Sequence, residues 1–226
     1  MPSQFGQDLL VLELLNGKRG GYFIDSGASD GVSVSNTLLL ERAFDWRGIC
    51  IEPNDAFYAK LVQNRRCCCV NCCLSDRPGQ VAFVEGAGTL GGILDDYEPG
   101  LLRHAMATYG LERDADGRPT TVPKEARTVR SVLAECGAPP VIDYWSLDTE
   151  GSELRILKSF PFDEFLVQVL TVEHNRFPIR EEIRIFLVGL GYRRAAALEI
   201  DDCYVHESVR SGSWRSRVWG RSGVRR

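Results

Sequence analysis

The sequence predicts an α/β fold in which short buried strands alternate with helices. Three observations support this prediction. An apolar strand at residues 22–25 runs into a glycine-rich turn, and a helix with an apolar face is expected over residues 33–44. A second apolar strand, at residues 48–51, ends at Glu52. The chain has 226 residues and is 44% hydrophobic, which is enough for one substantial core.

The glycine-rich turn predicts a nucleotide-like cofactor. Gly27 and Gly31 allow backbone conformations that bring the chain close to a ligand. Glu52 follows Gly31 by about twenty positions, the spacing at which an acidic residue binds ribose hydroxyls in dinucleotide-type folds. The turn lacks the Gly-x-Gly-x-x-Gly pattern that binds a pyrophosphate. We therefore expect a cofactor without a diphosphate, with a plain strand-to-helix turn as the alternative.

Six stretches of the chain occur in the order found in one known family. They are residues 3–8, 25–31, 51–53, 70–76, 142–153 and 172–175. This ordered set resembles the FkbM family of class I S-adenosylmethionine-dependent methyltransferases over roughly residues 3–206. The resemblance implies a Rossmann-like class I methyltransferase fold, with a seven-stranded, mostly parallel sheet and helices on both faces. It also implies methyl transfer from S-adenosyl-L-methionine, usually to a hydroxyl of a sugar, polyketide or other small metabolite.

The resemblance further indicates which residues bind the cofactor. These are Asp25, Ser26, Gly27, Ser29, Gly31, Glu52, Cys73, Leu74, Ser75 and Asp148. Cys73 and Leu74 are expected to line the adenine, with Ser75 or Asp76 nearby. For Leu74 and Ser75, a turn without a ligand is the alternative.

Candidate catalytic residues follow two further predicted strands. The strand at 141–147 ends at Asp148, and the strand at 166–172 ends at Glu173 and His174. Parallel strands present their carboxyl ends at one edge of a sheet, where ligands bind. Transfer of a methyl group to oxygen requires a group that takes the hydroxyl proton, so Asp148, Glu173 and His174 are the predicted catalytic residues. Glu150 and Glu153 are weaker candidates, because acidic residues in a first helical turn also stabilise the helix dipole.

A divalent metal such as Mg²⁺ is an alternative way to acidify the hydroxyl. Catechol O-methyltransferases hold Mg²⁺ with an Asp after the fourth strand and an Asp-Asn pair after the fifth. Asp148, Glu173 and His174 occupy similar places here. The chain departs from that pattern at His174 and at the longer Glu173, so a metal-free base remains open, as does a structural role for His174.

The predicted domain organisation is one methyltransferase domain over residues 1–208. It opens with a helix at 3–16 and contains a flap, or acceptor-specificity insertion, at 86–124. A third strand is expected at 67–72 and an edge strand at 80–85. A helix at 183–190, a strand at 192–198 and an antiparallel strand at 201–206 complete the domain. Residues 209–226 carry six arginines and predict a disordered basic tail.

The eight cysteines are expected to be reduced. Those at 67–73 fall on a predicted strand whose side chains alternate between two faces, so they cannot converge on one zinc ion, and neither zinc nor a disulfide is expected. The amino terminus lacks the pattern of a signal peptide, and no long apolar run is present, so a cytoplasmic protein without a membrane span is expected. A net charge of −4 argues against nucleic acid as a partner.

Two other functions remain open. An NAD(P)-dependent oxidoreductase on a related fold is disfavoured by the missing dinucleotide pattern. A non-catalytic cofactor-binding module is disfavoured by the acidic residues at the strand ends. The expected partner is a small hydroxylated acceptor. The oligomeric state stays open, with a homodimer as one option.

Overall fold

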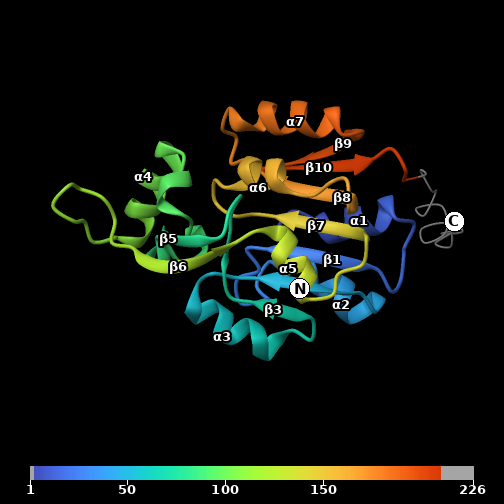
Figure 1. The fold of residues 1–226 in the computed structure, drawn as a ribbon, viewed down its shortest axis with the longest axis horizontal. Helices are drawn as coiled ribbons and strands as arrows, with labels where there is room; N and C mark the ends of the chain where they lie inside the picture. The colour runs from blue at the N-terminus through green and yellow to red at the C-terminus, as the bar shows by residue number, and fades with distance from the viewer. Residues whose placement is uncertain (1–2, 210–226) are drawn as a thin grey trace, which may run out of the picture.

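A computed structural model describes residues 3–209 of the chain. Its main sheet has seven strands (Figure 1). In sheet order they are β3 (Cys68–Val70), β2 (Arg47–Ile51), β1 (Tyr22–Ser26), β7 (Val141–Leu147), β8 (Leu166–Glu173), β10 (Asp201–His206) and β9 (Tyr192–Leu198). The first five strands are parallel, and β10 is antiparallel to both of its neighbours. The predicted seven-stranded, mostly parallel sheet with an antiparallel closing strand is confirmed.

Helices cover both faces of this sheet because successive strand side chains point to opposite sides. On β1, Ile24 packs into one buried cluster and Phe23 into the other. The first cluster includes side chains from α5 (Val129–Glu135), α6 (Glu153–Ser159) and α7 (Ile179–Gly189). The second includes side chains from α1 (Gln7–Leu14), α2 (Leu38–Phe44) and α3 (Asp55–Asn64). The predicted Rossmann-like fold with helices on both faces is therefore confirmed.

Two predicted helices begin later than expected. The helix predicted from residue 33 starts at Leu38, because the preceding backbone is held in turns. The Asp30 carboxylate accepts from the N–H groups of Val32 and Ser33, and the Ser35 hydroxyl accepts from that of Leu38. Such side-chain bonds compete with helical ones. At the amino terminus, the expected helix at 3–16 is shortened to α1.

A second sheet of three strands lies beside the main sheet. Its order is β4 (Cys73–Leu74), β6 (Val122–Arg127) and β5 (Gly79–Phe83). The predicted third strand at 67–72 is therefore too long, because β3 ends at Val70 and the chain enters the second sheet at Cys73. The sequence interpretation missed β6, which contains a proline and three charged residues among its six positions.

The segment between β5 and β6 folds against this second sheet. It contains η1 (Glu85–Leu90), η2 (Leu94–Asp96) and α4 (Pro99–Tyr109), and Figure 1 shows α4, β5 and β6 grouped together. Val84, Ala87 and Leu101 form part of a small apolar cluster of its own. The predicted insertion at 86–124 overlaps this region but cuts into β6. Its role in acceptor specificity stays a prediction.

One cysteine prediction is wrong. Cys68 on β3 forms a disulfide with Cys136, the residue that follows α5. The alternation argument considered only the cysteines of the 67–73 run and missed a partner 68 residues away. Cys50 and Cys67 remain free thiols with their sulfur atoms 3.4 Å apart. Within residues 3–209, the group of three or more side chains placed so that they could share a metal ion consists of carboxylates and contains no cysteine.

No helix in the described residues, 3–209, combines the length and apolar character needed to cross a bilayer. The predicted disordered tail at 209–226 lies outside the described residues, apart from Val209.

Candidate active site

A cavity opens at the carboxyl ends of β1, β2, β7 and β8 and extends beneath the Gly88–Ile93 segment. Most of the predicted cofactor residues line it, namely Asp25, Ser26, Gly27, Ser29, Glu52, Cys73, Leu74 and Asp148. Gly31 and Ser75 are not among its lining residues. Of the predicted catalytic residues, Asp148 and Glu173 line the cavity and His174 does not. The strand ends therefore bring together most of the predicted site.

The two glycines of the first turn are required by the packing of the protein itself. Gly27 has a φ of 84°, and a Cβ built there would overlap the backbone carbonyl oxygen of Asp148. Gly31 has a φ of 77°, and a Cβ there would meet the side chains of Leu61 and Arg65 at 2.6 and 2.7 Å. Gly31 lies away from the cavity, so its predicted contact with the cofactor has no support in the geometry.

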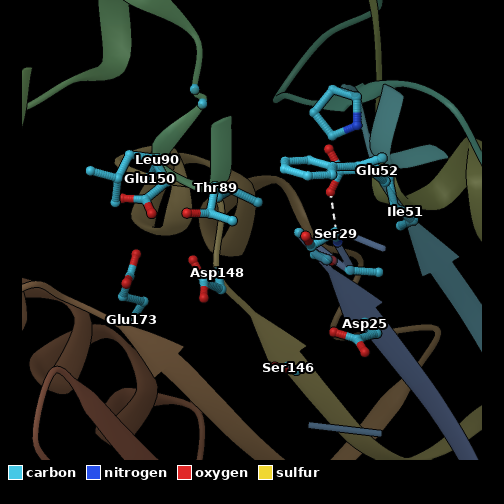
Figure 2. A pocket seen from close by; sticks show the side chains of 18 of the residues that line it. Asp25, Ser29, Ile51, Glu52, Thr89, Leu90, Ser146, Asp148, Glu150 and Glu173 are labelled. Carbon is cyan, nitrogen blue, oxygen red and sulfur yellow. Dashed lines mark hydrogen bonds between the residues drawn. The ribbon is translucent and has the colours of Figure 1, made fainter. Parts of the chain in front are cut away.

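Glu52 is fixed by two backbone hydrogen bonds. Its Oε2 accepts from the Ser29 N–H at 2.8 Å, the bond drawn in Figure 2, and its Oε1 accepts from the Asn54 N–H at 2.8 Å. The Asn54 side chain in turn caps α3. Burial raises the pKa of Glu52 to about 7. Each carboxylate oxygen can accept a second bond, so Glu52 is oriented to receive two hydroxyls.

The side chain of Asp25 is fixed by contacts with neighbouring protein side chains. The Thr37 hydroxyl donates to its Oδ2 at 2.5 Å, and the buried Arg65 guanidinium lies 3.9 Å from the same oxygen. Arg65 also donates to Thr37 at 2.9 Å and to Glu41 at 2.7 Å. Burial raises the pKa of Asp25 despite the nearby Arg65 charge. Asp25 is thus anchored by a polar network beneath the first turn.

Three carboxylates meet at the opposite end of the cavity. Asp148 follows β7, Glu150 lies in the loop before α6, and Glu173 ends β8. One oxygen from each lies within 4.8 Å of the others, and Figure 2 shows the three groups facing a common space. We call these three residues the acid cluster. It contains two of the predicted catalytic residues and adds Glu150.

Burial and mutual repulsion make the acid cluster hard to ionise. Burial and then the Asp201 carboxylate raise the pKa of Asp148 to about 8. Burial and then Asp148 raise the pKa values of Glu150 and Glu173 well above the usual range. Perturbed carboxylates of this kind, gathered in a cavity, are typical of functional sites.

Glu150 was predicted to lie in the first turn of a helix, and that prediction is wrong. The helix begins at Glu153, and Glu150 has a φ of 57°, which turns it toward the cavity. Its Oε2 accepts from the Asn175 amide at 3.3 Å. Glu153 instead accepts hydrogen bonds from Thr149 and Gly151, which close the loop at the start of α6. The structural interpretation of Glu153 fits this geometry.

His174 was predicted beside Glu173 in the site, but the structure turns it away. Neighbouring residues at a strand end point to opposite sides, so when Glu173 faces the cavity His174 cannot. Its Nδ1 accepts from the Arg176 N–H at 2.9 Å, and its Nε2 lies 3.8 Å from Oδ1 of Asp202. Burial lowers the pKa of His174. The predicted metal set of Asp148, Glu173 and His174 does not assemble, and Glu150 takes the third place.

Residues 88–93 cover the cavity, and we call them the segment above the cavity. They contribute polar and apolar contacts but no positive charge. Thr89 and Leu90 line the cavity, and the Thr89 hydroxyl is 3.0 Å from that of Tyr109. Lys124 pairs with Asp55 at 2.6 Å and Glu85 at 2.8 Å, which fastens η1 to α3. Among the described lining residues there are five carboxylates and no Lys, Arg or His. The cavity therefore favours cationic ligands.

The comparison with family models agrees with the predicted family. The domain model described as Methyltransferase FkbM domain matches residues 25–194. Among solved structures, the chain is similar to precorrin-6y C5,15-methyltransferase from Geobacter metallireducens GS-15, with 11% identity and a TM-score of 0.41, covering 88% of this chain and 85% of that one. No curated protein matches the chain. The family match spans most of the fold, including the strand ends that build the cavity, and the chain belongs to the FkbM family of methyltransferases.

Proposed function

We propose that the protein is an S-adenosylmethionine-dependent O-methyltransferase that acts on a hydroxyl of a sugar, polyketide or other small metabolite. One observation carries the proposal: a single cavity holds an oriented carboxylate, Glu52, on one side and the acid cluster on the other (Figure 2). The first suits a nucleoside, and the second suits a reacting hydroxyl.

On this proposal the cofactor lies across the ends of β1 and β2. Glu52 accepts hydrogen bonds from the two ribose hydroxyls, since its carboxylate is already fixed by Ser29 and Asn54. Cys73 and Leu74, both buried, form the wall beside the adenine. Asp148 belongs to the acid cluster and lines the same cavity as Glu52, so on this proposal it faces the bound cofactor as well as the acceptor.

The chemistry requires one bond to form as another breaks. The acceptor oxygen attacks the methyl carbon, the carbon–sulfur bond breaks, and its electron pair stays on sulfur, which gives neutral S-adenosylhomocysteine. The hydroxyl proton must leave, and carboxylates with pKa values raised toward or above neutrality hold a proton well. The acid cluster offers such groups. Holding both reactants in line supplies much of the remaining acceleration, up to about 7–11 kcal/mol in the best cases.

The first test is the thermal stability of the purified chain with S-adenosylhomocysteine, with NADH and buffer as controls. A ligand at one hundred times its Kd stabilises a protein by about 2.7 kcal/mol. We expect a clear rise in Tm with S-adenosylhomocysteine alone. A rise with NADH alone would instead support the oxidoreductase, and no rise with either would support a non-binding fold.

The second test identifies the acceptor. Hydroxylated metabolites are incubated with the protein and methyl-labelled S-adenosylmethionine, and the product is tested for a label on oxygen by mass spectrometry and alkaline stability. Labelled methyl ethers would support the proposal. Label found only on nitrogen or carbon would contradict O-methylation while leaving methyl transfer intact.

A further inference from the structure

We propose that the acid cluster of Asp148, Glu150 and Glu173 binds a divalent cation such as Mg²⁺ or Mn²⁺. The binding site is inferred from the cluster alone. Its part in methyl transfer rests on the proposed function, because the cation would hold the acceptor hydroxyl beside the cofactor.

The geometry of the cluster suits a single ion. Oxygens from three carboxylates lie within 4.8 Å of one another. An octahedral Mg²⁺ binds oxygens at about 2.0–2.1 Å, so its ligands lie about 3–4 Å apart. Small side-chain movements would bring the three groups to that spacing. They come from the end of β7, the following loop and the end of β8, and β7 and β8 are neighbouring strands of the main sheet.

A second observation is independent of this grouping. Glu173 exposes only 4% of its surface, and within the described part of the chain its Oε2 is buried without a hydrogen-bond partner. Buried carboxylate oxygens almost always have a partner. Here the nearby group that could share a proton with Glu173 is the Asp148 carboxyl of the same cluster. Glu173 points into the space shared with Asp148 and Glu150 (Figure 2). A cation there would satisfy it.

The surroundings complete the arrangement expected of a metal site. The Asn175 amide holds one oxygen of Glu150, leaving the other to face the cluster. Such outer contacts orient metal ligands. Asp148 is only half-buried, which leaves room for water or an acceptor hydroxyl on the cavity side. A metal-bound ligand needs this open position.

The charge and the donor atoms together favour a hard divalent ion. Three carboxylates carry up to three negative charges, and among the described lining residues no basic side chain offsets them. An ammonium group would leave two charges uncompensated, whereas a divalent ion leaves one. The donors are oxygens alone, since His174 points away, and oxygen ligands favour Mg²⁺ or Mn²⁺ over Zn²⁺.

The consequence for the proposed reaction is a more acidic acceptor hydroxyl. Bound to the ion, the hydroxyl gives its proton to the second oxygen of Asp148, the oxygen that need not bind the metal. The resulting alkoxide forms its bond to the methyl carbon while the carbon–sulfur bond breaks, and the electron pair remains on sulfur. No other reactant is needed.

The experiment is a Mn²⁺ titration of the full chain, followed by the electron paramagnetic resonance signal of free Mn²⁺, without cofactor or acceptor. We expect one site in the wild type, with Mg²⁺ competing. Glu173→Gln and Glu150→Gln should each weaken binding at least about tenfold. Glu52→Gln makes the same charge change in the same cavity at a carboxylate that already has partners, so its Mn²⁺ affinity should match the wild type. Thermal melts check that each variant is folded.

Three outcomes would overturn the site. One is a wild-type chain that binds no Mn²⁺, and another is equal affinity in the wild type, Glu173→Gln and Glu150→Gln. The third is an equal loss in Glu52→Gln, which would indicate a general effect of charge. If Mn²⁺ fails to bind but ethylammonium binds and is lost in Glu173→Gln, the cluster takes an amine instead. Because the titration uses no cofactor, a failure of S-adenosylhomocysteine binding leaves it interpretable.

Discussion

The two ends of the cavity hold carboxylates of different kinds. At the β1 and β2 end, Glu52 accepts from two backbone N–H groups and Asp25 accepts from Thr37 beside Arg65. At the β7 and β8 end, Glu173 keeps a buried oxygen without a partner in the described part of the chain. Carboxylates with built-in partners are oriented and suit neutral donors such as hydroxyls. The carboxyl group of Glu173 is hard to ionise in the empty cavity, and a proton or a cation that enters the cavity would supply the partner that its buried oxygen lacks.

The largest expected effect is a loss of methyl-transfer rate without a loss of cofactor binding, which would distinguish the acid cluster from the cofactor end of the cavity. Glu173→Gln should lower the rate of methyl transfer by about 10²- to 10⁴-fold, because it removes a charge that the hydroxyl proton or its cation requires. Binding of S-adenosylhomocysteine should stay within twofold of the wild type. Initial rates and calorimetric titrations measure both quantities. Loss of cofactor binding together with activity would mean that the ends are not separate.

A second variant changes Gly27, which packs against the Asp148 backbone and so joins the first turn to the acid cluster. Gly27→Ala places a Cβ against the Asp148 carbonyl oxygen and should lower the free energy of unfolding by about 2–4 kcal/mol, from overpacking and an unfavourable positive φ. Gly20→Ala is the matched control, because Gly20 has a φ of 65° and no described atom within 4 Å of a Cβ. It should cost about 1–2 kcal/mol. If urea denaturation showed the same loss in the free energy of unfolding for Gly27→Ala and Gly20→Ala, the overlap with the Asp148 carbonyl oxygen would not be the cause.

A change at Glu52 is expected to have the opposite effect: cofactor binding weakens while the rate at saturating cofactor is kept. Glu52→Gln weakens the bonds to the ribose and should cost about 1.5–3 kcal/mol of cofactor binding, or about 10- to 150-fold in Kd. At saturating cofactor the rate should remain close to that of the wild type. Calorimetry with S-adenosylhomocysteine and rates at high S-adenosylmethionine test the two parts. An unchanged Kd would remove Glu52 from the cofactor site.

The sequence predicted the centre of the main sheet well because β1, β2, β7 and β8 are mostly buried on both faces and read as short apolar runs. The acidic residues at their ends were recognisable for the same reason, since Asp25, Glu52, Asp148 and Glu173 each follow such a run. Parallel topology then brings them to one edge. These parts of the fold and the site depend on local patterns that the sequence displays directly.

What was missed depends on contacts between distant segments or on single backbone angles. Glu150 reaches the cavity because its own φ is positive and the following Gly151 packs against the Asp96 carbonyl. His174 is the exception, because a local pattern was available: neighbouring residues of a strand point to opposite sides, so His174 and Glu173 could have been expected to face apart. Cys68 pairs with Cys136 across 68 residues of sequence, and no local pattern indicates that bond.

The comparison also predicts a pH dependence at the cofactor end. Burial raises the pKa of Glu52 to about 7, and ribose hydroxyls bind its ionised form. Affinity for S-adenosylhomocysteine should therefore fall about tenfold from pH 8 to pH 6 as Glu52 takes up a proton. Because the folded pKa is above the unfolded value, Glu52 also makes the free energy of unfolding fall as pH rises from about 4.5 to 7. Calorimetric titrations at three pH values measure the affinity, and in Glu52→Gln this component of the slope should be absent.

The smallest expected effect concerns the segment above the cavity. Tyr109→Phe removes the hydrogen bond between Tyr109 and Thr89, which lines the cavity. A hydrogen bond of this exposed kind contributes about 0.5–1.5 kcal/mol. If the segment orders the acceptor, KM for the acceptor should rise about two- to tenfold while the Kd of S-adenosylhomocysteine stays constant. A change in the affinity for S-adenosylhomocysteine, with KM for the acceptor unchanged, would contradict this assignment. Thr89 would then belong to the cofactor end of the cavity.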